Sequence, residues 1–202
     1  MDIQIKRLGQ VAYEATWCTM QAFTASRDEM TADELWVLEH PPIFTLGQAG
    51  RREHLLVESS IPVLAVDRGG QVTYHGPGQV VIYVLVDLKR RGYGVKELVT
   101  RMEQGVIDLL GESGIVAARW PNAPGVYVQG AKIAALGLRV KQSRTYHGLA
   151  LNVNMDLTPF SYINPCGYAG LAVTQTRDLG VSTDQEALGN RLSRLLATQI
   201  GI

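Results

Sequence analysis

The sequence predicts a single α/β domain of the α+β type, in which helices flank a mixed β-sheet, and three observations lead to this prediction. Several short apolar runs have the β-branched content of strands, and other segments carry apolar residues at helical spacing. Neither an internal repeat nor a linker divides the 202 residues. A chain of this length can bury a substantial core, so we expect one domain over residues 1–202.

The first half of the chain predicts a helix followed by strands. Val11, Ala15, Cys18 and Ala22 recur at i, i+4, i+7 and i+11, which places them on one inward helical face. Cys18 is therefore expected to be a small buried hydrophobe. The segments with strand character are Glu34 to Glu39, Ile43 to Leu46, Ile61 to Val66 and the apolar run Val80 to Leu88.

The second half predicts two helices around a group of three strands. Gly94 could begin the clearest helix, whose apolar stripe is Val95, Leu98, Val99, Met102, Val106, Leu109 and Leu110. The three expected strands are Gly125 to Val128, Ala131 to Val140 and Tyr146 to Met155, with a polar turn at residues 142–144. A last helix is expected to begin near Ser182 and to bury Leu188, Leu192, Leu195, Leu196 and Ile200.

Charge and cysteine content exclude several classes of protein. With 19 basic and 19 acidic residues the formal charge is zero, so no global field favours nucleic acid or an anionic membrane. The clusters Lys89-Arg90-Arg91 and Arg139, Lys141, Arg144 are either solvated or face an acidic protein partner. No secretory signal or membrane-spanning apolar run is evident, so we expect a cytoplasmic protein. Two cysteines are too few for a disulfide framework and lack zinc-ligand spacing.

The segment Arg68-Gly69-Gly70-Gln71-Val72-Thr73-Tyr74-His75-Gly76-Pro77-Gly78-Gln79 is the most informative stretch of the chain. Glycine lets a ligand approach the backbone and permits positive φ, so N–H groups can turn inward as donors. The polar side chains of the segment favour binding of a small molecule or a carrier-bound group. The alternative is a structural connection between strands.

Cys166 and Lys132 are the candidate chemical groups. Cys166 lies between Pro165 and Gly167, which would stiffen the segment and leave the sulfur accessible; an inert loop cysteine is the alternative. Strand alternation places Lys132 on the face of Leu136, Leu138 and Val140, where a partly desolvated amine could accept a proton. A lysine that snorkels to the sheet edge is equally compatible with the pattern.

Small residues and histidines complete the candidate site. Gly148 and Ala150, which alternation places on the opposite face from His147, are small enough to line a groove beside Gly137 and Ala135. His147 is expected to be a satisfied core histidine, whereas His40 and His54 are expected to be structural or solvated. No Ser-His-Asp arrangement, P-loop or zinc-ligand spacing is evident.

The glycine-rich segment, the Lys132 strand and the Cys166 segment together resemble the octanoyl-[acyl-carrier-protein]:protein N-octanoyltransferases, also called lipoyl(octanoyl) transferases. Further matching motifs are Glu39 to Thr45, Asn122 to Tyr127 and Tyr146 to Asp156. The resemblance implies the fold of biotin and lipoate protein ligases, a Cys166 thioester and an assisting Lys132. The substrate-binding residues that it implies are Arg68, Gly69, Gly70, Gln71, Val72, Thr73, Tyr74, His75, Ala135, Leu136, Gly137, Gly148, Leu149 and Ala150.

The resemblance also implies the partners. Octanoyl-acyl carrier protein would be the donor, and the acceptors would be apo lipoyl domains of 2-oxoacid dehydrogenase complexes and the glycine cleavage H protein, with no cofactor, nucleic acid or membrane. Backbone N–H groups at Gly76 to Gly78 or at Gly167 could stabilise the oxyanion. Two alternatives remain at this stage, an ATP-dependent lipoate or biotin ligase and a non-catalytic module that binds acylated carriers.

Overall fold

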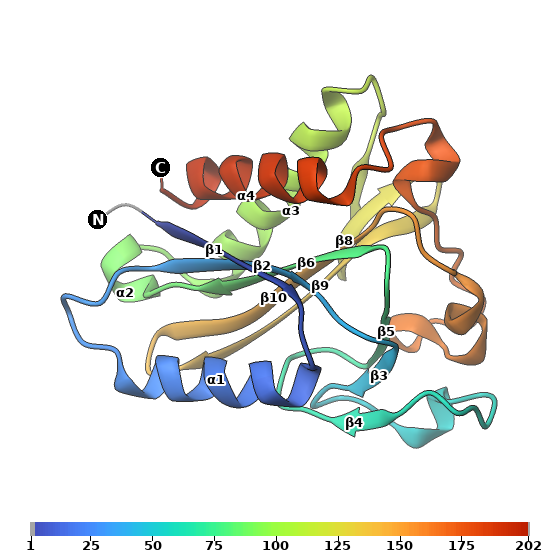
Figure 1. Cartoon of the computed structure of the whole chain (residues 1–202), viewed down its shortest axis with the longest axis horizontal. Helices are drawn as coiled ribbons and strands as arrows, with labels where there is room; N and C mark the ends of the chain where they lie inside the picture. Colours follow the sequence, from blue (N-terminus) through green and yellow to red (C-terminus); the bar gives the residue numbers. More distant parts are fainter. Residues whose placement is uncertain (1–2, 202) are drawn as a thin grey trace.

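A seven-stranded mixed sheet forms the centre of the computed structural model, which describes residues 3–201 except for the side chain of Cys166 (Figure 1). The strand order is β1-β2-β6-β10-β9-β8-β7; β1 is parallel to β2 and the other neighbours are antiparallel. The strands are β1 (Gln4–Gln10), β2 (Glu34–Glu39), β6 (Gln79–Leu85), β7 (Ala118–Trp120), β8 (Ala123–Val128), β9 (Ala131–Lys141) and β10 (Arg144–Asn152).

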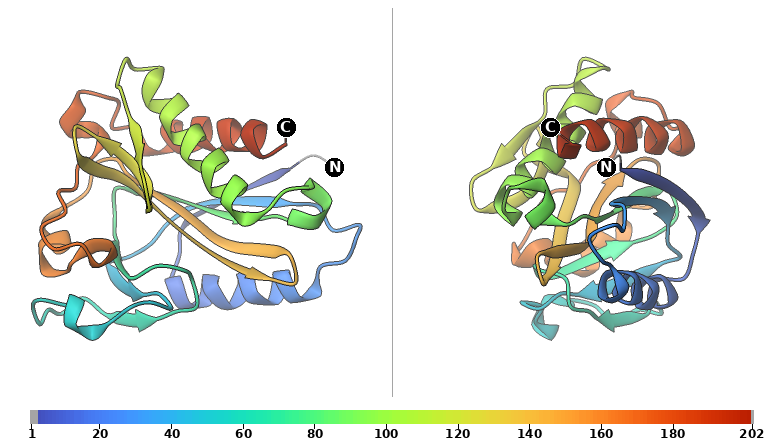
Figure 2. Two further views of the ribbon diagram at one scale, coloured as in Figure 1. Left: turned by 180° about the vertical axis from the view of Figure 1, so that it is seen from behind. Right: turned by 90° about the vertical axis from the view of Figure 1, so that its left-hand side faces the viewer.

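Helices cover both faces of this sheet (Figures 1 and 2). On one face, α3 (Val95–Gly111) and α4 (Gln185–Gly201) pack against each other and enclose the largest apolar core. On the other face, α1 (Tyr13–Ser26) covers a smaller core that includes Met20, Trp36 and Tyr83. The sheet thus lies between two helical layers, as the sequence predicts.

A second sheet of three strands lies beside the first. Its order is β4-β3-β5, from β4 (Val63–Ala65), β3 (Ile43–Leu46) and β5 (Val72–His75). The remaining elements are α2 (Leu88–Arg91) and the short 3-10 turns η1 (Arg52–His54), η2 (Thr158–Tyr162), η3 (Pro165–Gly167) and η4 (Thr176–Leu179). Because β5 leads directly into β6, the small sheet is tied to the centre of the large one.

Most of the expected elements are confirmed. β2 and β3 have the expected bounds, α3 follows Gly94, and the three strands near the middle of the chain are β8, β9 and β10. The expected strand at Ile61 to Val66 is the shorter β4. The tight turn between β9 and β10 places Gln142 and Ser143 at positive φ. Leu188, Leu192, Leu196 and Ile200 of α4 are buried.

The expected inner face of the first helix is wrong. The buried residues of α1 are Tyr13, Thr16, Met20 and Thr24, while Cys18 is exposed. The sequence was misleading because the inner face mixes large and polar side chains, such as Thr16, whose hydroxyl donates to the carbonyl of Ala12 at 2.8 Å. β1 was not expected, because most of its residues are exposed at the edge of the sheet and show no apolar alternation.

Internal ion pairs account for much of the first basic cluster. Asp33 has a fully buried carboxylate that pairs with Arg27, Arg90 and Arg91, the last through Nε at 2.7 Å. These arginines therefore tie α2 to the segment before β2. Among residues 3–201, no helix is long and apolar enough to cross a membrane.

Candidate active site

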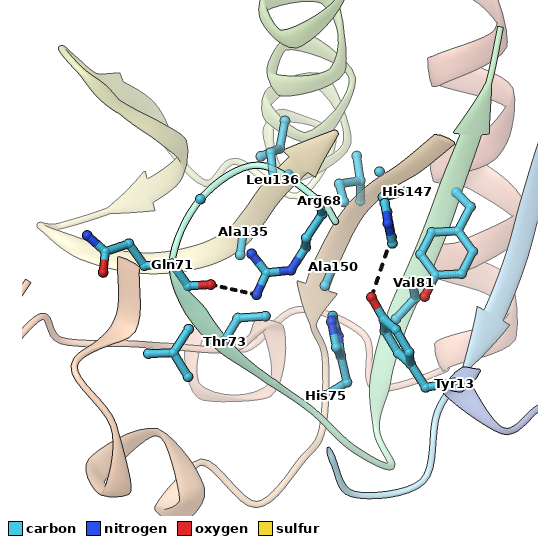
Figure 3. A pocket seen from close by; sticks show the side chains of 16 residues that line it. Tyr13, Arg68, Gln71, Thr73, His75, Val81, Ala135, Leu136, His147 and Ala150 are labelled. Carbon is cyan, nitrogen blue, oxygen red and sulfur yellow. Dashed lines mark hydrogen bonds between the residues drawn. The ribbon is translucent and has the colours of Figure 1, made fainter. Parts of the chain in front are cut away.

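Two adjoining cavities lie where β9, β10 and the glycine-rich segment meet. The inner cavity holds about 50 Å³ and the outer cavity about 360 Å³. Gly70, Gln71, Leu136 and Gly137 line both, so the two cavities adjoin at these residues. Figure 3 shows the inner cavity, with Gln71 at one end and Tyr13, His75 and His147 at the other.

Small residues on two paired strands form a wall of the inner cavity. Ala135 pairs with Ala150, and Gly137 pairs with Gly148 across β9 and β10. A Cβ on Gly148 would lie 2.0 Å from the carbonyl oxygen of Ile82, so this glycine also permits β10 to approach β6. The expectation that these four residues line a groove is confirmed.

The segment at residues 68–71 forms the opposite wall and is fixed from two sides. Gly69 donates from its backbone N–H to the carbonyl of Leu138 in β9 at 2.9 Å. The buried Arg68 guanidinium donates through Nη2 to the carbonyls of Thr45 at 2.7 Å and Gln71 at 2.8 Å. Arg68 therefore acts as a clamp within the loop as well as lining the cavity.

The end of the inner cavity away from the outer one is aromatic. Tyr13 stacks with His75 and His147, with ring centroids 5.7 and 6.5 Å apart, and Tyr83 also lines this end. Burial lowers the pKa of His75 to about 3, so this ring is neutral at neutral pH. Its Nδ1 lies 2.8 Å from Oε1 of Gln79. The end of the cavity thus carries no formal charge from this histidine.

His147 lies at positive φ and is held by Asp67. Nε2 of His147 donates to Oδ1 of Asp67 at 3.0 Å, and the indole of Trp17 donates to the same oxygen at 2.8 Å. Although burial raises the pKa of Asp67, the hydrogen bonds from His147, Tyr146 and Trp17 outweigh it and leave the pKa below its usual value. The prediction of a satisfied, buried His147 is confirmed, and the ring also borders the cavity.

Lys132 lies in the outer cavity and is only 4% exposed. Its Nζ donates to the carbonyl of Pro124 at 3.2 Å and lies 5.2 Å from the centroid of the Tyr127 ring. Leu136 and Leu138 line the same cavity, but the expectation that Lys132 shares one face of β9 with them and with Val140 is wrong. β9 has an extra residue, Ile133, where it pairs with β8, and this bulge interrupts the alternation; Val140 is 38% exposed. The lysine is desolvated rather than snorkelled to solvent.

The side chain of Cys166 lies outside the described part of the chain, but the backbone that carries it is described. Cys166 belongs to η3, and a Cβ on the following Gly167 would lie 2.7 Å from Nε2 of Gln71. Tyr168 lines the outer cavity together with Lys132. Further along, Thr174 donates from its backbone N–H to the carbonyl of Lys132 at 3.0 Å. The cysteine-bearing segment therefore runs along the outer cavity.

Most of the expected substrate-binding residues lie at this site, with two exceptions. Gly69 lines only the outer cavity, and the Tyr74 side chain lines neither, because it packs against Phe44 and Phe160. The inner cavity is lined by Arg68, Gly70, Gln71, Val72, Thr73, His75, Ala135, Leu136, Gly137, Gly148, Leu149 and Ala150 from the expected set. Within the expected loop, residues 72–75 form strand β5, whose pairing with β3 turns the Tyr74 side chain into the core.

The expected oxyanion donors at two glycines are not available. The backbone N–H of Gly78 donates to Oε2 of Glu39 at 2.8 Å. That of Gly167 donates to the carbonyl of Asn164 at 2.9 Å. The first of these bonds is a tertiary contact to a side chain of β2 and the second closes a local turn, so neither N–H is a preformed donor in this structure.

Sequence reasoning missed Tyr13, Val81 and Tyr83, which also line the inner cavity. Tyr13 comes from a helix more than fifty residues away along the chain from the glycine-rich segment. Val81 and Tyr83 share one face of β6, and period-two alternation through the expected strand could have identified them together. No comparable signal marks Tyr13.

The fold and site define a class of protein. Residues 12–194 match the family described as the lipoyl protein ligase A/B catalytic domain. A bi-partite lipoate protein ligase from Thermoplasma acidophilum, described with its E2 lipoyl domain, has a TM-score of 0.80 at 17% identity, covering 100% of this chain and 85% of that one. The biotin protein ligase of Aquifex aeolicus has a TM-score of 0.59 at 14% identity, covering 98% and 70%. The expected fold is confirmed.

A curated relative places the chain more narrowly. The octanoyltransferase of Thiobacillus denitrificans is 65% identical over 199 residues, which is 98% of this chain and 91% of the relative. The chain therefore belongs to the octanoyltransferases, which are enzymes of the lipoyl protein ligase A/B family.

Proposed function

We propose that this enzyme moves an octanoyl group from the thioester of octanoyl-acyl carrier protein to a lysine of apo lipoyl domains, through a thioester on Cys166. The observation that carries the proposal is the position of the buried Lys132 and the Cys166 segment along one cavity, which adjoins a second cavity lined by small residues. The octanoyltransferase relative supports the acyl group, and the Thermoplasma ligase with its E2 lipoyl domain supports the class of acceptor.

In the first half-reaction, the Cys166 thiolate attacks the carbonyl carbon of the donor thioester. A new carbon–sulfur bond forms to Cys166, and the bond to the pantetheine sulfur breaks. The departing thiolate takes a proton from the Lys132 ammonium, whose positive charge favours a thiolate nearby before attack. This step leaves an acyl-enzyme, a free pantetheine thiol and a neutral Lys132.

In the second half-reaction, the neutral amine of the acceptor lysine attacks the acyl-enzyme. The amide bond forms, the Cys166 thiolate departs, and Lys132 accepts the proton lost by the attacking amine. The thiolate and the ammonium are thereby restored for the next cycle. Because one thioester is exchanged for another and then for an amide, the reaction needs no nucleotide, and we propose that no cofactor takes part.

The inner cavity of about 50 Å³ would hold the far end of the acyl chain, and the outer cavity of about 360 Å³ would hold the part nearest the thioester. Ala135, Ala150 and Val81 present apolar surface along the inner cavity. Burial of each methylene contributes about 0.8 kcal/mol, so a chain of eight carbons would be favoured over short chains by several kcal/mol. The uncharged aromatic end at Tyr13 limits how far the chain can extend.

The apo lipoyl domains of 2-oxoacid dehydrogenase complexes and the glycine cleavage H protein are the acceptors that we propose. A transfer assay tests the whole proposal. Octanoyl-acyl carrier protein and an apo lipoyl domain are incubated with the enzyme without ATP, and octanoylation of the domain is followed by mass. We expect transfer from this donor and none from octanoate plus ATP.

Two results of that assay would contradict the proposal. Equal rates from octanoate plus ATP would identify a ligase that activates a free acid as an adenylate. Absence of transfer from either donor, with retained binding of the acylated carrier, would identify a non-catalytic binding module.

A further inference from the structure

Three aligned groups lie behind the reaction site: the Lys132 ammonium, the Tyr127 ring and the Trp120 indole. Nζ of Lys132 lies over the Tyr127 ring, 5.2 Å from its centroid. On the same ring, Trp120 stacks with a centroid distance of 4.4 Å and an interplanar angle of 10°. Tyr127 is 2% exposed, whereas Trp120 is 45% exposed. The tyrosine ring thus contacts a buried cation as well as a half-exposed indole.

The pairing of β8 with β9 places the Tyr127 ring beside Lys132. The pairing of β8 with β9 shifts between Val126 and Tyr127, and this irregularity sets Tyr127 opposite Lys132. Gly125 has φ of +145°, and a Cβ there would lie 2.8 Å from the carbonyl oxygen of Ala134 and 3.0 Å from Cε of Lys132, so a side chain at this position would crowd both the β9 backbone and the lysine.

Glu103 of α3 fixes the same irregular point. Its Oε1 accepts from the backbone N–H of Gly125 at 2.9 Å, and its Oε2 pairs with Nε of Arg119 at 3.1 Å. The buried Glu103 carboxylate thus joins the Gly125 backbone to Arg119 beside the register shift that sets Tyr127 opposite Lys132.

We propose that Tyr127 is a positioning residue that holds the Lys132 ammonium toward the Cys166 segment through the face of its ring, with Trp120 as the support that fixes the ring. The negative face of an aromatic ring stabilises a desolvated cation, and stacking in parallel keeps that face turned toward the lysine. Trp120 lies on an edge strand and is too exposed to serve mainly as core, which is consistent with a supporting role. This inference rests on the proposed role of Lys132.

Tyr127→Phe and Tyr127→Leu form the test pair. Both variants lose the hydroxyl that donates to the carbonyl of Ala123 at 3.1 Å, but only Phe keeps the ring. The enzyme is labelled at lysine with ¹³C and ¹⁵N. Ring current shifts the Lys132 side-chain resonances upfield, and Lys132→Ala assigns them. kcat and KM for octanoyl transfer are measured on the same samples.

We expect Tyr127→Phe to keep the upfield shift and a kcat within twofold of the parent enzyme. Tyr127→Leu should lose the shift and about tenfold in kcat, with KM within twofold, because a cation–π contact of a desolvated lysine is worth about one factor of ten. Retained kcat in folded Tyr127→Leu, or no upfield shift in the parent enzyme, would overturn the inference.

If Tyr127→Leu does not fold, Trp120→Ala tests the inference instead. The indole is half-exposed, so we expect its removal to leave the protein folded. We expect a smaller upfield shift of Lys132 and a severalfold lower kcat; no change in either would overturn the supporting role. Lys132→Ala distinguishes failure of the proposed role of Lys132 from failure of the inferred role of Tyr127. If Lys132→Ala retains full transfer, the proposed function of the lysine fails, whereas loss there with unaffected Tyr127→Leu refutes only the inference about Tyr127.

Discussion

Substitution of Ala150 by valine should shorten the acyl chain that the enzyme prefers. Ala150 is 4% exposed, lines the inner cavity and pairs with Ala135 across the β10–β9 ladder. Valine suits a strand and adds two methyl groups, which would take the room of about two methylenes. At about 0.8 kcal/mol for each buried methylene, octanoyl binding loses about 1.6 kcal/mol, which is roughly a 15-fold change in selectivity.

The assay compares kcat/KM for octanoyl and hexanoyl donors on the same carrier protein. We expect the ratio of kcat/KM for octanoyl to kcat/KM for hexanoyl to fall roughly 15-fold in Ala150→Val. A hexanoyl chain is about two methylenes shorter, so it does not need the part of the inner cavity that the valine fills. Ala134→Val is the matched control, since Ala134 is equally buried on β9 but belongs to the core under α3 and α4. An unchanged ratio in Ala150→Val would refute the placement of the chain in the inner cavity.

Three further predictions concern Lys132, His40 and Asp67. Lys132→Ala should lower kcat by about 100-fold or more, the usual scale of a lost proton-transfer group, while the melting temperature changes little; a kcat within a few fold of the parent would exclude the role. Burial lowers the pKa of His40 to about 4 from 6.5, so the stability that neutral His40 contributes is fully present above pH 6.5, and about 3 kcal/mol of it is lost as the pH drops toward 4. The pKa of His75, lowered to about 3, adds a loss in the same direction, so urea unfolding should show a fall of at least about 3 kcal/mol across this range, and a flat profile would contradict it. Asp67→Ala should cost about 2–4 kcal/mol in urea unfolding, because Trp17 and His147 lose their acceptor, and a cost below about 0.5 kcal/mol would show that these donors find other partners.

Much of the fold follows from local sequence patterns, and the exceptions have a physical cause. The strand β2 is a continuous apolar run and the helix α3 has an apolar stripe at helical spacing, and both lie where expected. β1 and the inner face of α1 do not follow such a pattern. β1 is an exposed edge strand, and Tyr13 and Thr16 satisfy their polar atoms in tertiary or helix contacts, so hydrophobic pattern alone could not identify them.

The site was predictable where residue type itself carries the chemistry. The paired small residues of β9 and β10 lie at the inner cavity, as side-chain size indicates, and Lys132 lies at the outer cavity although a bulge in β9 interrupts the alternation that was used to place it. The Tyr74 side chain could not be placed, because the glycine-rich segment contains a strand whose partner, β3, is distant in sequence. The contribution of Tyr13 and the register shift that aims Tyr127 at Lys132 likewise depend on tertiary packing.

The central claim is that Cys166 carries the acyl group between donor and acceptor. Intact mass spectrometry of the enzyme mixed with octanoyl-acyl carrier protein, in the absence of an acceptor, tests it most directly. The account predicts one octanoyl adduct that hydroxylamine removes, that peptide mapping places on Cys166, and that is missing in Cys166→Ala. An unmodified enzyme that still octanoylates the lipoyl domain, or an adduct that persists in Cys166→Ala, would contradict it.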